Sequence, residues 1–224
     1  MSAQHSAYGS DIKKALLDHL GDQVAPFLRS MPDNGLGNLS NQQHGDEREV
    51  VIALSGGLDS VVLLHLCVLH PNIAKVRALH INHHLQPQCD DWAGFCHQQC
   101  AALGVVCEVI DVYPRSHSEQ DARDARYQAF ESALNSQQLL LAAHHANDQA
   151  ETLLYRLARG TGLTGMRGIC RARKLGESQI VRPLLAIERK TLRSYAQTYQ
   201  LQWIEDPSNQ STQYDRNHLR HKVL

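Results

Sequence analysis

A short polar loop between two apolar segments carries the residues of this chain that are best suited to chemistry. Residues 55–60 read Ser-Gly-Gly-Leu-Asp-Ser, after an apolar run at 50–54 and before another at 61–66. The first run has the length of a buried strand, and the second can belong to a buried helix. Glycines let a backbone approach an anion closely, and the free N–H groups of a first helical turn point toward it. The pattern predicts a phosphate-binding loop; a packed strand–turn–helix connection is the alternative.

A second polar segment, residues 144–152, follows another apolar run and reads His-His-Ala-Asn-Asp-Gln-Ala-Glu-Thr. Asn147 is a good helix N-cap and carboxylates favour a first helical turn, so capping accounts for part of this composition. Histidine and carboxylates beside a nucleotide site also suit Mg²⁺ binding and recognition of an amine. A zinc site is a weaker alternative, because an ion that accompanies phosphate groups prefers oxygen ligands.

Alternating strands and helices must position these two segments. We expect strands at 50–54, 75–81, 105–112 and 139–143, and helices after the first loop and at 90–103, 119–135 and 147–159. This order predicts an α/β fold with a parallel five-stranded sheet and helices on both faces. Ligands of such sheets bind beyond the C-terminal ends of the strands, where both polar segments fall.

The two ends of the chain differ from this regular middle. We expect a helix at 9–30, a polar and glycine-rich linker at 31–48, a short edge strand at 180–185, a helix at 188–200 and a basic helical segment at 211–224. The predicted organisation is therefore an N-terminal helix and linker (1–48), a nucleotide-binding domain (49–187) and a basic helical extension (188–224).

Composition and charge narrow the classes of protein. A chain of 224 residues with 42% hydrophobic content suits one α/β domain. Residues 1–155 hold 9 Lys/Arg against 18 Asp/Glu, whereas residues 156–224 hold 13 against 5. A basic final third is a plausible footprint for nucleic acid, and segregated surface charge is the alternative. No apolar run approaches the ~20 residues of a membrane span and no signal peptide is visible, so we expect a cytoplasmic protein with no membrane partner.

The cysteines invite a metal hypothesis that we do not favour. Cys96 and Cys100 are four residues apart on a predicted helix, with His97 between them. No Cys-x-x-Cys pair occurs. Buried, reduced thiols are the better interpretation in a cytosolic enzyme.

Taken in order, the motifs resemble those of a known family. The motif at 55–60 resembles the pyrophosphate loop of ATP-pyrophosphatases, and it lacks the Gly-Lys-Ser/Thr ending of a Walker loop. The motif at 144–152 follows it, and Arg-Gly-Thr-Gly-Leu-Thr-Gly-Met at 159–166, Arg-Pro-Leu-Leu at 182–185, Asp-Pro-Ser-Asn at 206–209 and Arg-Asn at 216–217 complete the series. Together they are similar to the tRNA(Ile)-lysidine synthetase family, with an adenine nucleotide alpha hydrolase-like fold. Asn147 departs from the acidic residue of many relatives.

The resemblance implies a two-step ligation with ATP and Mg²⁺ as cofactors. ATP would adenylate the C2 carbonyl oxygen of the wobble cytidine in tRNA(Ile) with a CAU anticodon, releasing pyrophosphate. The amine of L-lysine would then attack C2 and expel AMP. A homodimer stays open as an assembly state, and relatives carry further C-terminal domains that grip the tRNA. We therefore expect residues 1–224 alone to modify tRNA poorly.

Specific residues receive roles in this scheme. The residues expected around ATP are Ala53, Ser55, Gly56, Gly57, Leu58, Asp59, Ser60, His80 and Ile81. The expected catalytic residues are Asp59, Arg126, His144, Asp148 and Glu151, with Asp59 and Asp148 as metal ligands. The expected tRNA contacts are Arg159, Arg167, Arg182, Arg216 and Arg220. An ion pair with Asp124 or Glu131 is the structural alternative for Arg126.

Two other functions remain as alternatives. The first is a different pyrophosphate-loop enzyme, such as a tRNA thiolase or an amidotransferase-type synthetase. Thiolases of this kind commonly carry Cys-x-x-Cys pairs, and this sequence has none. The second is a non-catalytic nucleotide- or RNA-binding module, which would not need Asp59, Asp148 and Glu151.

Overall fold

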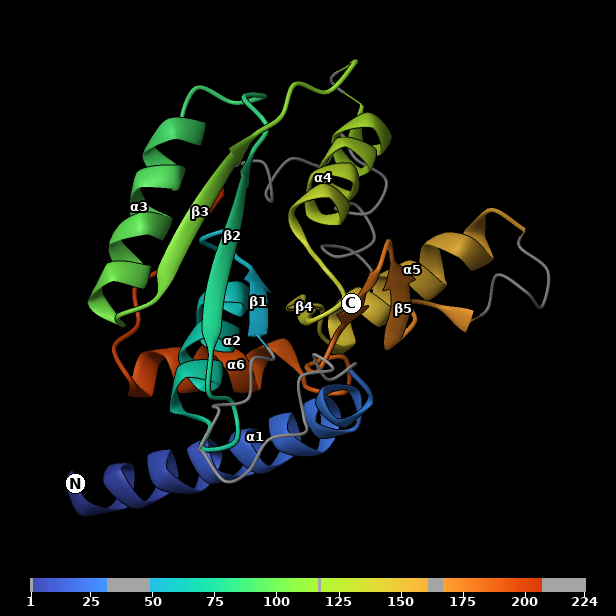
Figure 1. The fold of residues 1–224 in the computed structure, drawn as a ribbon. Coiled ribbons are helices and arrows are strands. Elements are labelled where there is room, and N and C mark those ends of the chain that lie inside the picture. The colour runs from blue at the N-terminus through green and yellow to red at the C-terminus, as the bar shows by residue number, and fades with distance from the viewer. Residues whose placement is uncertain (1, 32–48, 117, 161–166, 207–224) are drawn as a thin grey trace, which may run out of the picture.

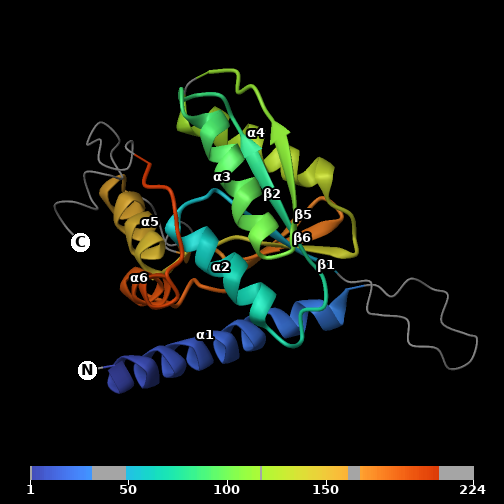
Figure 2. The ribbon, with the colours of Figure 1, turned by 90° about the vertical axis from the view of Figure 1, so that its left-hand side faces the viewer.

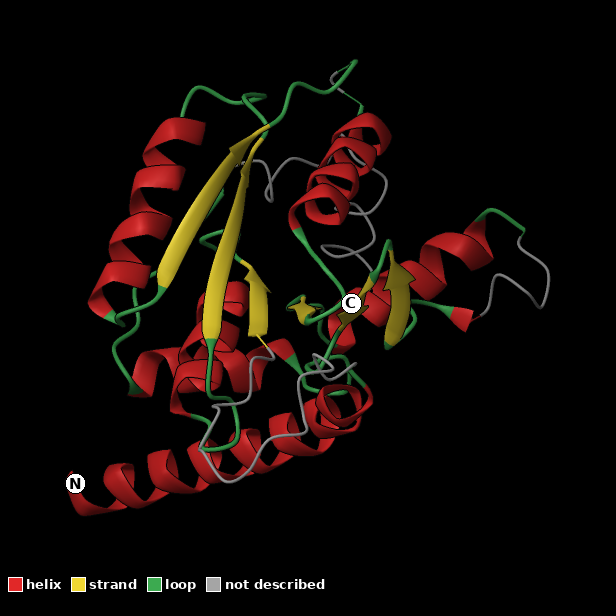
Figure 3. Ribbon diagram, viewed as in Figure 1, coloured by secondary structure: helices red, strands yellow, loops and turns green. Residues whose placement is uncertain are grey.

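A twisted sheet with helices on both faces forms the centre of the molecule (Figures 1 and 3). The computed structural model describes residues 2–31, 49–116, 118–160 and 167–206, and the side chains from residue 9 onward. The helices are α1 (Ser2–Ser30), α2 (Leu58–Leu69), α3 (Cys89–Ala102), α4 (Glu119–Ala133), α5 (Ala146–Ala158) and α6 (Arg189–Thr198). The strands are β1 (Glu49–Ala53), β2 (Val76–Asn82), β3 (Val106–Asp111), β4 (Gln138–Leu141), β5 (Ala172–Leu175) and β6 (Ser178–Val181).

The sheet contains the five parallel strands that the sequence predicts and one strand that it does not. Its order is β3-β2-β1-β4-β6-β5, and the first five of these are parallel to one another. β5 pairs antiparallel with β6 and forms the edge. The expected edge strand at 180–185 was therefore wrong in position, because β6 lies between β4 and β5. The polar sequence of β5, Ala-Arg-Lys-Leu, carries no apolar alternation that would have predicted a strand.

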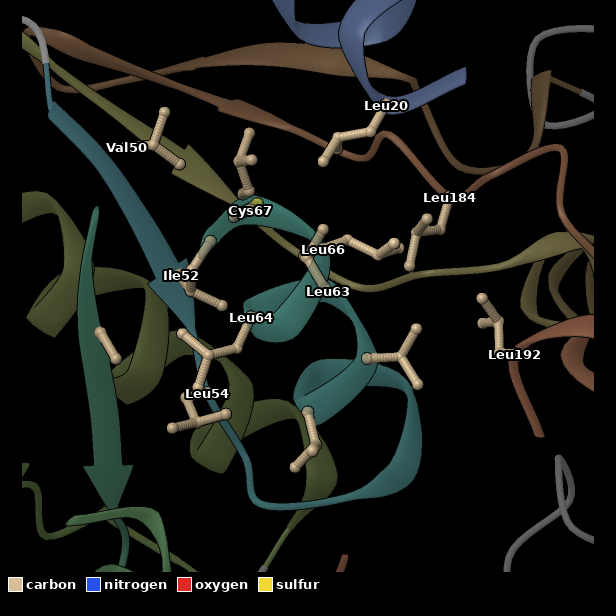
Figure 4. Close-up of a cluster of buried hydrophobic side chains, with 14 of the residues drawn as sticks. Leu20, Val50, Ile52, Leu54, Leu63, Leu64, Leu66, Cys67, Leu184 and Leu192 are labelled. Carbon is tan, nitrogen blue, oxygen red and sulfur yellow. The ribbon is translucent and has the colours of Figure 1, made fainter. Parts of the chain in front are cut away.

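Two apolar clusters hold the layers together, one on each face of the sheet. Alternate residues of β1 supply both, with Val50 and Ile52 in the larger cluster and Val51 in the smaller. The larger cluster joins the sheet to α1, α2, α3 and α6, and Figure 4 shows its centre around α2. The smaller cluster packs α4 against the opposite face, so α3 and α4 lie on opposite sides of the sheet (Figures 1 and 2). Burial on both faces explains why β1 is apolar from Val50 to Ala53.

Both ends of the described chain share the larger core. Leu20 of α1 and Tyr195 of α6 have no exposed surface, and His19 contacts the carbonyl of Pro183 at 2.8 Å. α1 lies beneath α2 and α6 (Figure 2). A cavity of about 420 Å³ opens between α1 and His70, at the opposite end of α2 from the 55–60 loop. Most of the linker expected at 31–48 and the basic segment expected at 211–224 lie outside the described residues.

The order of the strands brings the two polar segments together. The chain passes from β1 to β2 on one side, and from β4 toward β6 on the other. β1 and β4 are direct neighbours, so the loops that follow them meet at the point where the direction of winding changes. In open α/β sheets, this position is where ligands bind. No helix of the described residues is long and apolar enough to cross a membrane.

Candidate active site

The 55–60 loop connects β1 to α2 and is held by its own serines. Gly56 has a φ of +82°, a left-handed conformation that favours glycine. The hydroxyl of Ser60 donates to the carbonyl of Gly57 at 2.9 Å and lies 3.0 Å from the hydroxyl of Ser55. The N–H of Gly57 in turn donates to Ser55 Oγ at 3.3 Å. These hydroxyls fix the shape of the loop, and their expected contacts with ATP stay a prediction.

The start of α2 offers backbone N–H groups to a ligand. Its N-cap residue is Gly57, which has no side chain to accept a hydrogen bond from the first turn. Unpaired amides at a helix N-terminus bind anions through both hydrogen bonds and the helix dipole. The loop can therefore hold phosphate groups, as the sequence predicts.

A distant segment of the chain packs directly onto this loop. The N–H of Ile204 donates to the carbonyl of Gly56 at 2.9 Å, and Ile204 also forms a parallel bridge with Gly57. A Cβ atom on Gly56 would lie 2.6 Å from Ile204 Cδ1 and 3.1 Å from Cys96 Sγ. Sequence reasoning missed Ile204, because nothing in its local sequence indicates pairing with a loop 148 residues earlier.

A buried histidine joins the two polar segments. His145 is 2% exposed, and its Nε2 lies 3.5 Å from Asp59 Oδ2. Its Nδ1 accepts a hydrogen bond from the N–H of Asp148 at 3.3 Å, while the Asp148 carboxylate accepts from the N–H of His145 at 2.9 Å. This reciprocal pair caps α5, so the N-cap is His145 and the prediction of Asn147 was wrong. Because Nδ1 accepts, the neutral ring carries its proton on Nε2, toward Asp59.

Asp148 lies close enough to two other carboxylates, Glu151 and Asp59, to be influenced by their charges. Burial raises the pKa of Asp148, and the negative charges of Glu151 and Asp59 raise it further against the opposing effect of His145. Glu151 is 6% exposed. Asp59 Oδ1 is buried without a hydrogen-bond partner among the described residues. The site therefore concentrates negative charge beside the phosphate-binding loop, as a cation or an amine requires.

Asn147 and Arg189 add a contact that sequence reasoning did not find. The side-chain oxygen of Asn147 accepts a hydrogen bond from the N–H of Arg189 at 3.1 Å, at the start of α6. The guanidinium of Arg189 reaches the same place, with Nε 3.7 Å from Asp59 Oδ2. The departure at Asn147 thus has a structural use, which is to fasten α6 to the active-site edge of the sheet.

His144 has an environment opposite to that of its neighbour. Burial lowers the pKa of His144, and the positive charges of Arg182, Arg123 and Arg126 act in the same direction, so that together they bring the pKa to about 3. Its Nδ1 is buried without a hydrogen-bond partner in the described part of the chain. A ring with this pKa is neutral at pH 7 and is a weak base. His144 can orient an amine through a hydrogen bond, but it is unsuited to removing a proton.

Arg126 and the residues expected around ATP lie in different parts of the fold. Arg126 is exposed on α4. It makes no ion pair within 4.0 Å of a described carboxylate. The alternative of an ion pair with Asp124 or Glu131 therefore finds no support. His80 contacts the carbonyl of Leu54 and Cys96 Sγ beneath the loop, at 2.9 and 3.3 Å. Ile81 belongs to the cluster on the other face. Ala53 ends β1, directly before the loop.

The cysteines are free thiols, most of them buried as expected, and Cys170 is exposed. Cys96 and Cys100 have no exposed surface, whereas His97 between them is exposed. Within the described residues, no cluster of His, Cys, Asp or Glu has three members placed to hold a metal ion. The metal hypothesis for Cys96 and Cys100 therefore finds no support.

The arginines expected to contact tRNA do not share one environment. Arg159 and Arg167 are exposed at the end of α5 and beyond it. Arg182 is 3% exposed and donates to the carbonyl of Cys170 and the hydroxyl of Tyr127, at 2.7 and 3.2 Å. The structure corrects the expectation that Arg182 lies on an RNA-binding surface, because its guanidinium is enclosed. Arg216 and Arg220 lie outside the described residues, as do parts of the motifs at 159–166 and 206–209.

Comparison with known proteins shows the family of the chain. The PP-loop domain family matches residues 33–224, so the chain belongs to the PP-loop family of ATP-binding domains. The chain is also similar to proteins named tRNA(Ile)-lysidine synthase. It is 51% identical to that of Alkalilimnicola ehrlichii over 178 residues, and 46% identical to that of Yersinia pestis over 190 residues. These matches cover 77% and 81% of this chain, but 40% and 41% of the relatives.

Solved structures confirm the fold. The U34-tRNA thiolase NcsA from Methanococcus maripaludis, solved with its [4Fe-4S] cluster, superposes with a TM-score of 0.68 over 95% of this chain and 72% of its own, at 15% identity. NMN synthetase from Francisella tularensis superposes with a TM-score of 0.52 over 96% of this chain and 87% of its own, at 12% identity. At such identities, the likeness is one of fold.

Proposed function

We propose that this chain is the catalytic part of an enzyme that ligates L-lysine to C2 of the wobble cytidine in tRNA(Ile) with a CAU anticodon. One observation carries the proposal: His145 joins the phosphate-binding loop, through Asp59, to the carboxylate group at the start of α5. The names of relatives at 45–51% identity support the same reaction. The chain spans about 40% of the length of these relatives, so the activity of a whole enzyme is part of the proposal.

The loop would serve the first step. The C2 carbonyl oxygen of cytidine attacks the α-phosphorus of ATP, and the bond to the bridging oxygen of pyrophosphate breaks. Amides at the start of α2 bind the departing phosphates and stabilise the charge that develops on them. Arg189, held beside Asp59 by Asn147, is suited to the same anion.

The carboxylates would serve the second step. Asp148 and Glu151 lie together near Asp59, where they can attract an ammonium group. The ammonium group passes a proton to Glu151 before the neutral amine attacks C2, and AMP departs with the electrons of the broken C–O bond. His144, neutral at pH 7, can accept a hydrogen bond from this amine and hold it in place.

The residues present fit a magnesium ion. Mg²⁺ is held in most phosphate-transfer sites by one or two carboxylates together with substrate phosphates and water. Asp59 Oδ1 is buried with no hydrogen-bond partner among the described residues, and Asp148 shares its surroundings. These two residues would hold the ion, which would offset negative charge on the phosphates as pyrophosphate leaves.

The RNA would lie over exposed basic residues of the last third of the chain. Arg159 and Arg167 are exposed beyond α5, and we keep Arg216 and Arg220 as candidates from the sequence. Arg126 is exposed beside the site and could contact the phosphates or the target base. Recognition of a single wobble base requires that the base leave its stack.

Release of AMP with one substrate omitted at a time tests the proposal. We expect release that needs ATP, L-lysine and tRNA(Ile) with a CAU anticodon together, and a loss of at least about 100-fold in Asp59→Ala. Asp91→Ala, at an exposed position of α3, is the matched control. Release that is indifferent to lysine would reject ligation and favour another PP-loop enzyme, such as a thiolase. Undiminished activity of Asp59→Ala would remove its assignment.

A further inference from the structure

Four arginines surround Tyr127 and His144 on the α4 side of the site. This arginine group consists of Arg123, Arg126, Arg173 and Arg182. The Arg182 guanidinium donates to the hydroxyl of Tyr127 at 3.2 Å. The guanidinium carbons of Arg173 and Arg123 lie 4.2 and 5.5 Å from the centre of the same ring. Tyr127 therefore acts as a hub that holds three of the cations near one another.

No described carboxylate lies within ion-pair distance of the arginine group, and the negative charge of Glu119 acts on Arg126 only from further away. Arg182 is 3% exposed, and its Nε has no hydrogen-bond partner in the described part of the chain. A buried guanidinium without an anion is costly, so a stable arrangement of this kind points to an anionic ligand.

The electrostatics of Tyr127 agree with this interpretation. Burial alone would raise the pKa of its hydroxyl, yet Arg182, Arg123 and Arg173 outweigh burial and leave the pKa lowered. The arginine group thus creates a strongly positive potential in a partly enclosed place. That potential also reaches His144, whose pKa the same side of the site depresses.

Positive and negative groups lie on opposite sides of two consecutive residues. His145 contacts Asp59 and Asp148, at 3.5 Å in each case. The charges that act most strongly on His144 are those of Arg182, Arg123 and Arg126, followed by that of His145. A ligand beside this segment would meet carboxylates at one end and guanidinium groups at the other.

We propose that the arginine group binds the α-carboxylate of the amino acid that is ligated, which leaves its side-chain amine at Asp148 and Glu151. This inference rests on the proposed function. A carboxylate matches the planar guanidinium fork, and at the end of a flexible aliphatic chain it can reach an enclosed arginine. A phosphate within an RNA strand is attached on both sides, which suits an exposed cation better than Arg182.

Acceptor specificity tests the inference. AMP release is compared with L-lysine and with 1,5-diaminopentane, which has the same terminal amine and no carboxylate. We expect wild-type kcat/KM to be at least about tenfold higher for lysine, since hydrogen bonds between charged groups are stronger than those between neutral groups. Arg173→Gln and Arg123→Gln should each reduce this preference several-fold by raising the KM for lysine, with the KM for ATP unchanged.

A matched variant shows whether recognition belongs to the arginine group or to positive charge in general. Lys174→Gln removes a positive charge from the next residue of β5, at an exposed position, and should keep the preference for lysine. Arg182→Gln is a further variant of the arginine group, and circular dichroism and thermal unfolding check that it folds. If it is unstable, Arg173→Gln, at an exposed position, tests the arginine group in its place. An unchanged preference for lysine in Arg173→Gln and Arg123→Gln would overturn the inference, as would a raised KM for tRNA or ATP alone. Wild-type release that ignores lysine would instead reject the proposed function itself.

Discussion

His144 and His145 show how strongly one residue's position in the fold determines its chemistry. Both follow β4, and both are histidines beside a nucleotide site. His145 is tied between two carboxylates and caps a helix. His144 faces guanidinium groups, and its pKa falls to about 3. The sequence made His144 an expected catalytic residue, and its environment favours a hydrogen-bonding role over proton transfer.

The depressed pKa of His144 predicts a pH dependence of stability. In the unfolded chain the ring titrates near 6.5, but in the folded chain it stays neutral down to about pH 3. The unfolded state therefore takes up a proton that the folded state does not as pH falls below 6.5, and stability falls with it. His144→Gln should reduce the loss of unfolding free energy between pH 7 and pH 5, by at most about 1.4 kcal/mol per pH unit.

Urea unfolding at several pH values measures this effect. His97→Gln, at an exposed position of α3, should leave the slope of stability against pH unchanged. Equal slopes for wild type and His144→Gln would contradict the predicted burial of a neutral ring.

Contacts between elements give the phosphate-binding loop its shape. The sequence of the loop predicts a glycine turn before a helix, and the structure confirms it. The segment that packs onto the loop comes from beyond α6, through the Ile204 hydrogen bond and bridge. α6 itself is fastened to the start of α5 by Asn147 and Arg189. The loop is thus supported by contacts that no local sequence motif predicts.

Gly56→Ala tests this support. Alanine is strained at a φ of +82°. Its Cβ would lie 2.6 Å from Ile204 Cδ1, so the isoleucine side chain would have to move. We expect a loss of about 1–2 kcal/mol in unfolding free energy and clearly weaker ATP binding, measured by denaturant unfolding and by calorimetry. Gly104→Ala shares the positive φ but meets open space, so it should cost less stability and leave ATP binding intact. If both variants bound ATP equally well, the packing of Ile204 against Gly56 would not contribute to ATP binding.

The distribution of charge is a property of the whole molecule. Acidic residues predominate before residue 156 and basic residues after it. In the structure this excess divides further: Arg159 and Arg167 are exposed, whereas Arg182 is enclosed with Tyr127. Net charge along the sequence therefore overstates the surface available to RNA.

Salt dependence of RNA binding measures that surface. Arg159→Gln and Arg167→Gln should each weaken tRNA binding and lower the slope of log K against log salt by roughly 0.7, because each phosphate contact releases a counterion. Lys14→Gln, an exposed position of α1 in the acidic part of the chain, is the control and should change neither. An unaltered slope in both arginine variants would place the RNA elsewhere.

The sequence by itself determined the order of strands and helices and the nature of the phosphate-binding loop. Apolar runs and glycine positions encode local backbone structure, and helix N-termini carry their affinity for anions with them. The one missed strand, β5, is short and polar, so its pairing with β6 comes from the tertiary structure.

Only the tertiary structure decided which side chains act together. The bridge from Asp59 through His145 to Asp148, the arrival of Ile204 at Gly56 and the enclosure of Arg182 by Tyr127 all join separate parts of the chain. Such contacts depend on strand order and on which face of a helix is buried, and local periodicity does not specify either. The chemistry of this site depends on a loop that the sequence predicts and on side chains that the fold brings next to it.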